Sequence, residues 1–187
     1  MHVRRADSDV SIRGEQPGEE PAVRALVERS FGQAVVGELV DALRDSWAWV
    51  DGLSFVAVRD EELVGHVLFT RSWLDAPRHL VEVLVLSPLC VAPEQREQGI
   101  GGRLVTEGLD RLADRPEPLV VLEGSPRYYR RFGFRPAREL GLRRPSTRIP
   151  EESFQALARP SHDPSLTGTL VYAEPFWALD CVGLRDD

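Results

Sequence analysis

Lysine is absent from the sequence: all 23 basic residues are arginine, and with 30 acidic residues the formal net charge is −7. This acidic balance argues against a nucleic-acid-binding surface and weakly favours a cationic partner. No apolar run reaches the length of about 20 residues that crosses a bilayer. No hydrophobic segment follows the first few residues, so a secretion signal is not expected. We therefore expect a cytoplasmic protein with no membrane or nucleic-acid partner.

Cysteine is also scarce, since the chain contains only Cys90 and Cys181. The two lie far apart and lack the spacing of metal ligands, so we expect reduced thiols and no metal. The phosphate-binding sequences Gly-x-Gly-x-x-Gly after the first strand and Gly-Lys-Ser/Thr are missing too. Their absence disfavours the usual nucleotide-binding folds.

The length of 187 residues suits one domain, 1–187, with a sizeable core. Residues 1–9 are polar, and we expect them to be loose. Apolar periodicity then predicts helices over 17–31 and 35–44, followed by a hairpin of strands 53–59 and 63–71. The chain shows no internal repeat and no low-complexity tract.

The middle of the chain reads as strand 81–91, helix 99–113 and strand 119–123, which predicts two parallel neighbouring strands. Pro88 cannot donate to a strand ladder, so we expect the pair to splay apart there. The fold class is therefore α/β (α+β). We expect a mixed sheet of about six to seven strands, with an antiparallel N-terminal hairpin and helices on both faces.

The last third of the chain is less regular. A short helix capped by Gly133 is expected before a strand, and a proline-rich stretch covers 135–166. Within that stretch Pro150 predicts the start of a short helix. A closing strand is expected over 166–173, with Phe176 and Trp177 packed under it.

The residues 84–104 read L-V-L-S-P-L-C-V-A-P-E-Q-R-E-Q-G-I-G-G-R-L. A strand leads here into a helix through Gly99, Gly101 and Gly102. Backbone N–H groups in the first turn of a helix lack partners, and glycines let an anion approach them. The splayed strand beside them leaves backbone groups of 89–91 free to pair with an extended amide. This combination suits the pyrophosphate and pantetheine of coenzyme A.

Two motifs resemble the GNAT acetyltransferase family. Residues 96–101, Arg-Glu-Gln-Gly-Ile-Gly, fit its Gln/Arg-x-x-Gly-x-Gly/Ala signature, and Tyr129 stands where the family has a Tyr shortly before a Gly-Phe pair, here Gly133 and Phe134. The string around Tyr129 and the long connection after it resemble the branch of predicted N-acetyltransferases. The resemblance implies direct transfer of an acetyl group from acetyl-CoA to a primary amine of a small molecule or protein. The alternative is a non-catalytic acyl-CoA sensor with the same fold.

The resemblance and the free N–H groups at the start of the helix, called the helix mouth below, together predict a set of coenzyme-binding residues. It consists of Leu89, Cys90, Val91, Arg96, Glu97, Gln98, Gly99, Ile100, Gly101, Gly102, Arg103 and Tyr129. Acetyl-CoA is the expected co-substrate, without a metal. Cys90 is interpreted as inert packing despite its place in this set, because it lies in an apolar strand with no histidine near it in sequence.

The catalytic prediction assigns Tyr129 as the acid that protonates the departing thiolate, and treats Tyr128 as core packing. Two carboxylates, Glu82 and Glu123, could act as the general base if each points into the gap between the splayed strands.

Histidine and tryptophan side chains offer further candidates for the site. His66 and His79 are further candidates for the base, although a structural role is favoured for His66. Trp47 and Trp49 are expected to pack in the core rather than to stack on a cationic amine. Contacts to the acceptor are expected from the first two helices, the hairpin and residues 135–166. The acceptor itself is open, other acyl groups are possible, and a homodimer is compatible with the sequence.

Overall fold

The computed structural model describes residues 9–183, so the expectation for residues 1–9 falls almost entirely outside the described part. Within that part a single sheet of nine strands runs in the order β1-β2-β3-β4-β5-β8-β6, with β9 beside β3 and β7 beside β9. The strands are β1 Ser11–Gly14, β2 Ser54–Arg59, β3 Glu62–Asp75, β4 Leu80–Val91, β5 Leu119–Glu123, β6 Arg135–Pro136, β7 Leu142–Arg143, β8 Phe154–Ala158 and β9 Gly168–Val171. The helices are α1 Glu20–Phe31, α2 Ala34–Arg44, α3 Ile100–Arg111, α4 Pro126–Tyr129 and α5 Glu174–Ala178, with short 3-10 turns at η1 Pro93–Gln95, η2 Arg130–Phe132 and η3 Ala137–Leu140.

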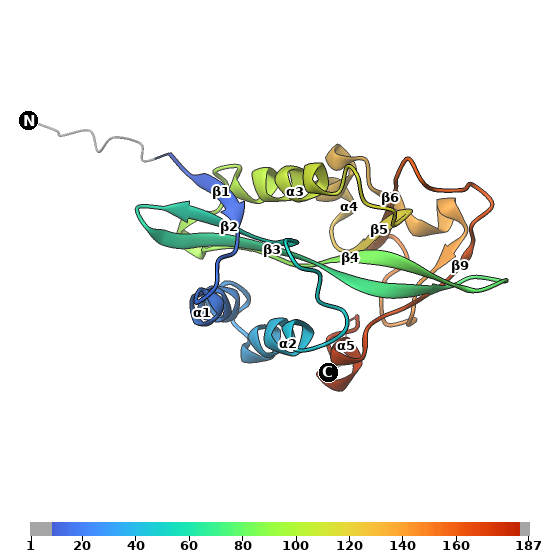
Figure 1. Ribbon diagram of the computed structural model, residues 1–187, viewed down its shortest axis with the longest axis horizontal. Coiled ribbons are helices and arrows are strands. Elements are labelled where there is room, and N and C mark those ends of the chain that lie inside the picture. The colour runs from blue at the N-terminus through green and yellow to red at the C-terminus, as the bar shows by residue number, and fades with distance from the viewer. Residues whose placement is uncertain (1–8, 184–187) are drawn as a thin grey trace, which may run out of the picture.

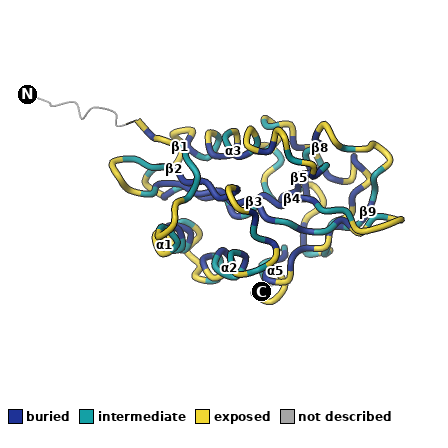
Figure 2. The backbone as a smooth tube through the Cα atoms, in the orientation of Figure 1, coloured by how far each residue is buried: buried dark blue, intermediate teal, exposed yellow. Residues whose placement is uncertain are grey.

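The sheet separates two helical layers (Figure 1). Helices α1, α2 and α5 cover one face, and α3 and α4 cover the other. Each long helix turns an apolar stripe toward the strands, as a 3.6-residue repeat requires, and its other side is exposed (Figure 2). The mixed α/β fold is confirmed. The sheet has more strands than expected because it includes two short strands, β6 and β7, of two residues each.

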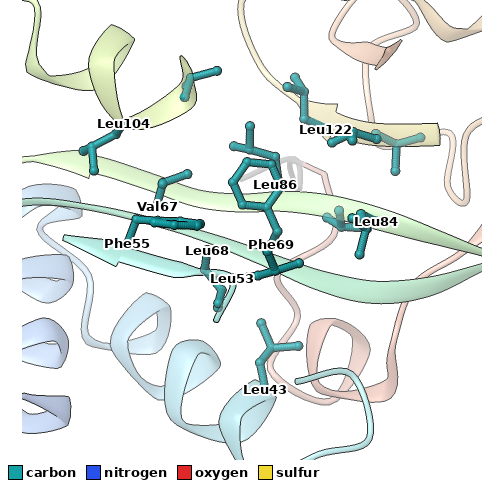
Figure 3. Packing of buried hydrophobic residues seen from close by; sticks show 14 of the residues in the cluster. Leu43, Leu53, Phe55, Val67, Leu68, Phe69, Leu84, Leu86, Leu104 and Leu122 are labelled. Carbon is teal, nitrogen blue, oxygen red and sulfur yellow. The ribbon is translucent and has the colours of Figure 1, made fainter. Parts of the chain in front are cut away.

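The core lies around the middle of β3 and β4, where both faces of the sheet are covered (Figure 3). Phe55 and Phe69 meet edge to face there, with ring centroids 6.4 Å apart, and both are buried. Helix α3 approaches Phe69 so closely that a Cβ at Gly108 would clash with its ring. A glycine is therefore required at this point of the helix to let it lie flat on the sheet.

The parallel pair β4–β5 is the feature that positions the site. Its register joins only Leu84 to Val120 and Val85 to Val121. Beyond Val85, β4 stays paired with β3, and the β3–β4 register shifts between Val67 and Phe69. The two parallel strands therefore separate after Val85, just before Pro88, as expected from the proline in the sequence.

Three local expectations were wrong. The helix expected from Pro150 is a turn that leads into β8, because β8 pairs along the whole of β5 and the sheet contact outweighs the local helix signal. Helix α1 begins at Glu20, after a turn in which Gly18 has φ 90°, and not at residue 17. Trp177 is 40% exposed on α5, whereas its neighbour Phe176 is buried as expected.

Candidate active site

The loop before α3 presents unpaired backbone N–H groups to one side. Glu97 and Gly99 both adopt left-handed backbone, with φ 64° and 80°. The N–H of Arg103 donates to the Gly99 carbonyl at 3.1 Å, which opens the helix and leaves the N–H groups of residues 100–102 without intrahelical partners. Alternating left-handed residues and a free first turn form a concave, electropositive surface. The loop can therefore hold an anion such as a phosphate.

Tyr128 and Arg131 cover this surface from the opposite side. A Cβ built on Gly101 would lie 2.7 Å from the Tyr128 hydroxyl, and one on Gly102 would lie 3.4 Å from Arg131 Nη2. The Arg131 guanidinium stacks on the Tyr128 ring, 4.2 Å from its centroid. The Tyr128 hydroxyl and the Arg131 guanidinium thus lie next to Gly101 and Gly102. The expectation that Tyr128 packs in the core was wrong.

A cavity of about 710 Å³ extends from this surface along the end of β4 to the C-terminal end of α1. An extended molecule with a phosphate at one end and amides along its length fits this shape and its chemistry. The lining residues are Ser30, Phe31, Leu89, Cys90, Val91, Gln95, Arg96, Glu97, Gly99, Ile100, Gly101, Gly102, Tyr128 and Arg131.

Arg96 joins two sides of the cavity. Its Nη2 donates to the Ser30 carbonyl at 2.6 Å and its Nε to the Val91 carbonyl at 3.3 Å. The Ser30 carbonyl lies in the last turn of α1, where carbonyls have no intrahelical donor, so Arg96 acts as a cap for that helix. The side chain is therefore engaged with backbone here rather than aimed at the anion surface.

Three of the predicted coenzyme-binding residues lie outside this cavity. Gln98 turns its side chain away and accepts a hydrogen bond from Arg59 at 2.8 Å. Arg103 donates to the Val10 carbonyl at 2.7 Å, and its N–H is already used inside the helix. Tyr129 lines a different cavity. Successive residues on a turn point in different directions, and sequence proximity to the glycines could not distinguish them.

A second cavity of about 350 Å³ lies in the gap beside the splayed strands and shares Phe31 and Leu89 with the first. Tyr129 and Glu123 both line it. Burial raises the pKa of Tyr129, with a smaller contribution from Tyr128, so the phenol stays protonated at neutral pH. No part of the chain between residues 9 and 183 accepts a hydrogen bond from the Tyr129 hydroxyl. That hydroxyl is therefore available to a bound molecule.

Glu123 is held from two directions at the end of β5. The Tyr172 hydroxyl donates to its Oε1 at 2.9 Å, and the Gly183 N–H donates to Oε2 at 3.2 Å. Burial raises the pKa of Glu123, against the opposing effects of these two donors and of Arg148. A carboxylate with a raised pKa in a cavity is suited to accept a proton near neutral pH.

The other candidate bases do not reach either cavity. Glu82 lies on the far side of the paired residues Leu84 and Val85, and its carboxylate meets Arg71 Nε at 3.2 Å, so the expectation that it points into the gap was wrong. His66 is fully buried against Ser54, 2.9 Å away, and burial lowers its pKa to about 3. His79 lies at the far end of the β3–β4 hairpin, next to Leu80.

The remaining candidates fall where the structure gives them packing or surface roles. Cys90 borders the first cavity, but burial raises the pKa of its thiol to about 11, so it is not a ready nucleophile. Trp49 packs partly against the core under Arg44. Trp47 is 45% exposed and stacks on Trp73 at 5.3 Å, which corrects the expectation of core packing.

Several lining residues carried no signal in the sequence. Asp180, Cys181 and Gly183 come from the C-terminal end of the described chain, and Phe31 comes from the end of the first helix. They reach the cavity only through the tertiary fold. Tyr128 could have been noticed as a second tyrosine beside Tyr129, although nothing in the sequence says which way each ring points.

Together, the fold and its two cavities define a class of protein: a mixed α/β domain whose parallel strands open beside a glycine-lined helix N-terminus. A family model described as the acetyltransferase (GNAT) domain matches residues 11–137. The chain therefore belongs to the GNAT acetyltransferase family, as its two motifs had indicated.

Individual relatives agree with this assignment. The uncharacterized N-acetyltransferase YhbS of Escherichia coli K12 is 36% identical over 170 residues, covering 88% of this chain and 97% of its own. YjhQ of the same strain, also an uncharacterized N-acetyltransferase, is 34% identical over 160 residues, covering 82% and 86%.

Two solved structures are similar over most of the chain. The crystal structure of Escherichia coli YhbS in complex with CoA has a TM-score of 0.81 at 32% identity, covering 94% of this chain and 96% of its own. A GNAT family acetyltransferase from Brucella melitensis, in complex with acetyl-CoA, has a TM-score of 0.72 at 31% identity, covering 90% and 99%.

None of the helices within residues 9–183 has both the length and the apolar character of a membrane span. Over the same residues, no group of three or more His, Cys, Asp or Glu side chains is arranged so that it could hold a metal ion.

Proposed function

We propose that this protein transfers an acetyl group from acetyl-CoA to a primary amine, by direct attack of the amine on the thioester. The observation that carries the proposal is the meeting of the two cavities at Phe31 and Leu89, with Tyr129 and Glu123 in the second of them. A coenzyme in the first cavity and an acceptor in the second would meet at this junction.

In this proposal the coenzyme is held mainly by backbone. The N–H groups of residues 100–102 and the left-handed turn before them bind the pyrophosphate, and the Tyr128 hydroxyl and Arg131 add contacts from the other side. The strand end at 89–91 pairs with the pantetheine amides. Crystals of two relatives, one with CoA and one with acetyl-CoA, support this choice of donor.

Glu123 and Tyr129 divide the proton transfers. The acceptor attacks as the neutral amine, and Glu123 takes the proton that its nitrogen loses as the new bond forms, directly or through one water, which the raised pKa of Glu123 favours. The amine nitrogen forms a bond to the thioester carbonyl carbon, and the carbon–sulfur bond breaks. Tyr129 donates its proton to the departing thiolate, and exchange with solvent restores both groups. No acyl-enzyme is required, and the raised pKa of Cys90 argues against one.

A non-catalytic acyl-CoA sensor would need the helix mouth but neither of the two proton-transfer groups. The free hydroxyl of Tyr129 and the raised pKa of Glu123, in one cavity, favour turnover. The cytoplasmic location and the homodimer stay predictions from the sequence.

Calorimetry with acetyl-CoA, followed by an assay of thiol release with a panel of primary amines, tests the proposal. We expect micromolar or tighter binding of acetyl-CoA and amine-dependent release of CoA, with the acetylated amine identified by mass spectrometry. Binding without release for any amine, amino acid or peptide would support the sensor instead. Absence of binding by folded protein would overturn both.

A further inference from the structure

We infer that the 350 Å³ cavity selects a small primary amine with an apolar body and no carboxylate beside the amino group. The inference rests on the proposed function, since it takes the second cavity as the acceptor site. It concerns which amine is used, which neither the family nor its motifs specify.

One part of the cavity wall is apolar, beside polar lining residues such as Gln33 and Ser87. Helix α2 contributes Val35, Val36 and Leu39, and the splayed part of β4 contributes Leu86 and Pro88. Contact with these groups is favourable only for a ligand that can give up its own apolar surface to them.

The charged groups in the cavity are of one sign. Glu123 and Asp180 are the two carboxylates, and the described residues that line it include no arginine, lysine or histidine. Burial raises the pKa of Cys181, and the nearby carboxylates of Asp180, Glu123 and Glu38 raise it further, so three acidic side chains surround this thiol. An ammonium group is attracted here, and a carboxylate is repelled.

Among the described residues, Arg148 is the basic side chain that meets these carboxylates, and it offsets this preference only in part. Arg148 Nη2 meets Asp180 Oδ1 at 3.5 Å, and its Nε donates to the Val182 carbonyl at 3.1 Å. It is tied to the C-terminal segment and is not among the lining residues. Among the described lining residues, an amino acid would therefore find no cationic partner for its carboxylate, although such a partner is what carboxylate recognition requires.

The C-terminal segment also limits the size of the acceptor. Asp180, Cys181 and Gly183 form one side of the cavity, and the bond from the Gly183 N–H to Glu123 holds that side against β5. Gly183 is packed so tightly that a Cβ there would lie 2.7 Å from the Arg148 carbonyl carbon. The cavity volume is at the lower end of the range of about 300–1,000 Å³ that small-molecule sites occupy. A small molecule fits this space better than a peptide N-terminus does.

Matched acceptors test the inference. We would compare 3-methylbutylamine with leucine, and 2-phenylethylamine with phenylalanine, because each pair differs only by the α-carboxylate. A short peptide with N-terminal alanine completes the set. We expect kcat/KM for each amine to exceed that of its amino acid by about tenfold or more, since one unfavourable charge contact of modest strength has that effect. Calorimetry of the same pairs with CoA-saturated protein should give the same order of affinity, without relying on turnover.

Asp180→Asn sharpens the test, with Asp110→Asn on the exposed side of α3 as the matched control. Asp180 has φ 54°, a conformation that Asn tolerates well, so the substitution should preserve the fold. It removes one negative charge and releases Arg148, so we expect the preference for amine over amino acid to fall by about threefold or more. The control should leave the preference unchanged.

The outcomes separate the two proposals. If leucine, phenylalanine or the peptide is acetylated as well as the amines, or better, the inference about the acceptor is wrong and the transferase proposal stands. If the CoA-saturated protein binds amines and amino acids equally or binds neither, the inference is also wrong. If acetyl-CoA itself does not bind, the proposed function fails first.

Discussion

The two cavities are built in opposite ways. The cavity proposed for the coenzyme takes most of its lining from one continuous stretch, 89–102, and offers mainly backbone groups to a ligand. The cavity proposed for the acceptor gathers side chains from α2, β4, β5 and the C-terminal segment, which lie far apart in the sequence. The first is a local property of the chain, whereas the second exists only after the whole domain has folded. A binding function shared by a family can reside in the first, and the choice of acceptor in the second.

Gly101→Glu should have the largest effect, and that effect should fall on the coenzyme cavity alone. The new side chain meets the Tyr128 hydroxyl and places a negative charge on the anion surface, which at a separation of about 4 Å costs about 4 kcal/mol. We expect calorimetry to show loss of acetyl-CoA affinity by about 100-fold or more. Thr106→Glu adds the same charge further along α3 and should retain most of the affinity. Equal affinity for both variants would exclude the helix mouth as the phosphate site.

Glu123→Gln should act on the acceptor side alone. We expect kcat to fall by about 100-fold, the usual contribution of a general base, while acetyl-CoA affinity is unchanged. The wild-type kcat/KM should fall as the pH drops through the raised pKa of Glu123, because only the ionised carboxylate accepts a proton. The variant should lack that acidic limb. If the variant still shows this fall in kcat/KM at low pH, the fall comes from another titratable group.

The adjacent tyrosines give the sharpest contrast between the cavities. Tyr129→Phe removes the hydroxyl from the cavity that Glu123 also lines, so we expect a fall in kcat of about tenfold or more with little change in acetyl-CoA affinity. Tyr128→Phe removes the hydroxyl over Gly101, so we expect affinity to fall by about tenfold with kcat largely kept. Steady-state kinetics and calorimetry on both variants measure this. The same pattern in both would refute the separation of roles.

Gly124→Ala should give the smallest effect. A Cβ at this position would clash with the Tyr129 ring, so the ring has to move or the loop has to shift. Such overpacking costs about 1–3 kcal/mol of unfolding free energy, which denaturant titration would detect. We expect a fall of a few fold in kcat and unchanged acetyl-CoA affinity. An unaltered unfolding midpoint would mean that Tyr129 is less confined than its surroundings indicate.

The sequence predicted what depends on neighbours along the chain. The strand-helix-strand unit, the parting of the strands at Pro88 and the glycine-lined helix mouth were all recognisable, because period, proline and glycine act within a few residues. The same reasoning failed for Pro150, where pairing of β8 with β5 overrides a local helix signal. Local chemistry therefore located the glycine-lined start of α3, but it did not show which neighbouring side chains face the cavity.

Predictions about direction were weaker. Sequence spacing could not say that Tyr128 faces Gly101 while Tyr129 lines the other cavity with Glu123. Nor could it say that Glu82 lies beyond the paired part of β4 and β5. The hydrogen bond from the Gly183 N–H to Glu123 could not be predicted either, because it forms only when the segment before residue 183 folds back onto β5. The extent of the single domain, from residue 1 to 187, remains a prediction.

Phe31 and Leu89 belong to the lining of both cavities. In the proposed function, a molecule bound in one cavity would fix these two side chains at the junction and so change the surface that a molecule in the other cavity meets. The two binding equilibria are then thermodynamically linked, and the factor by which one ligand changes the affinity of the other must be the same in both directions.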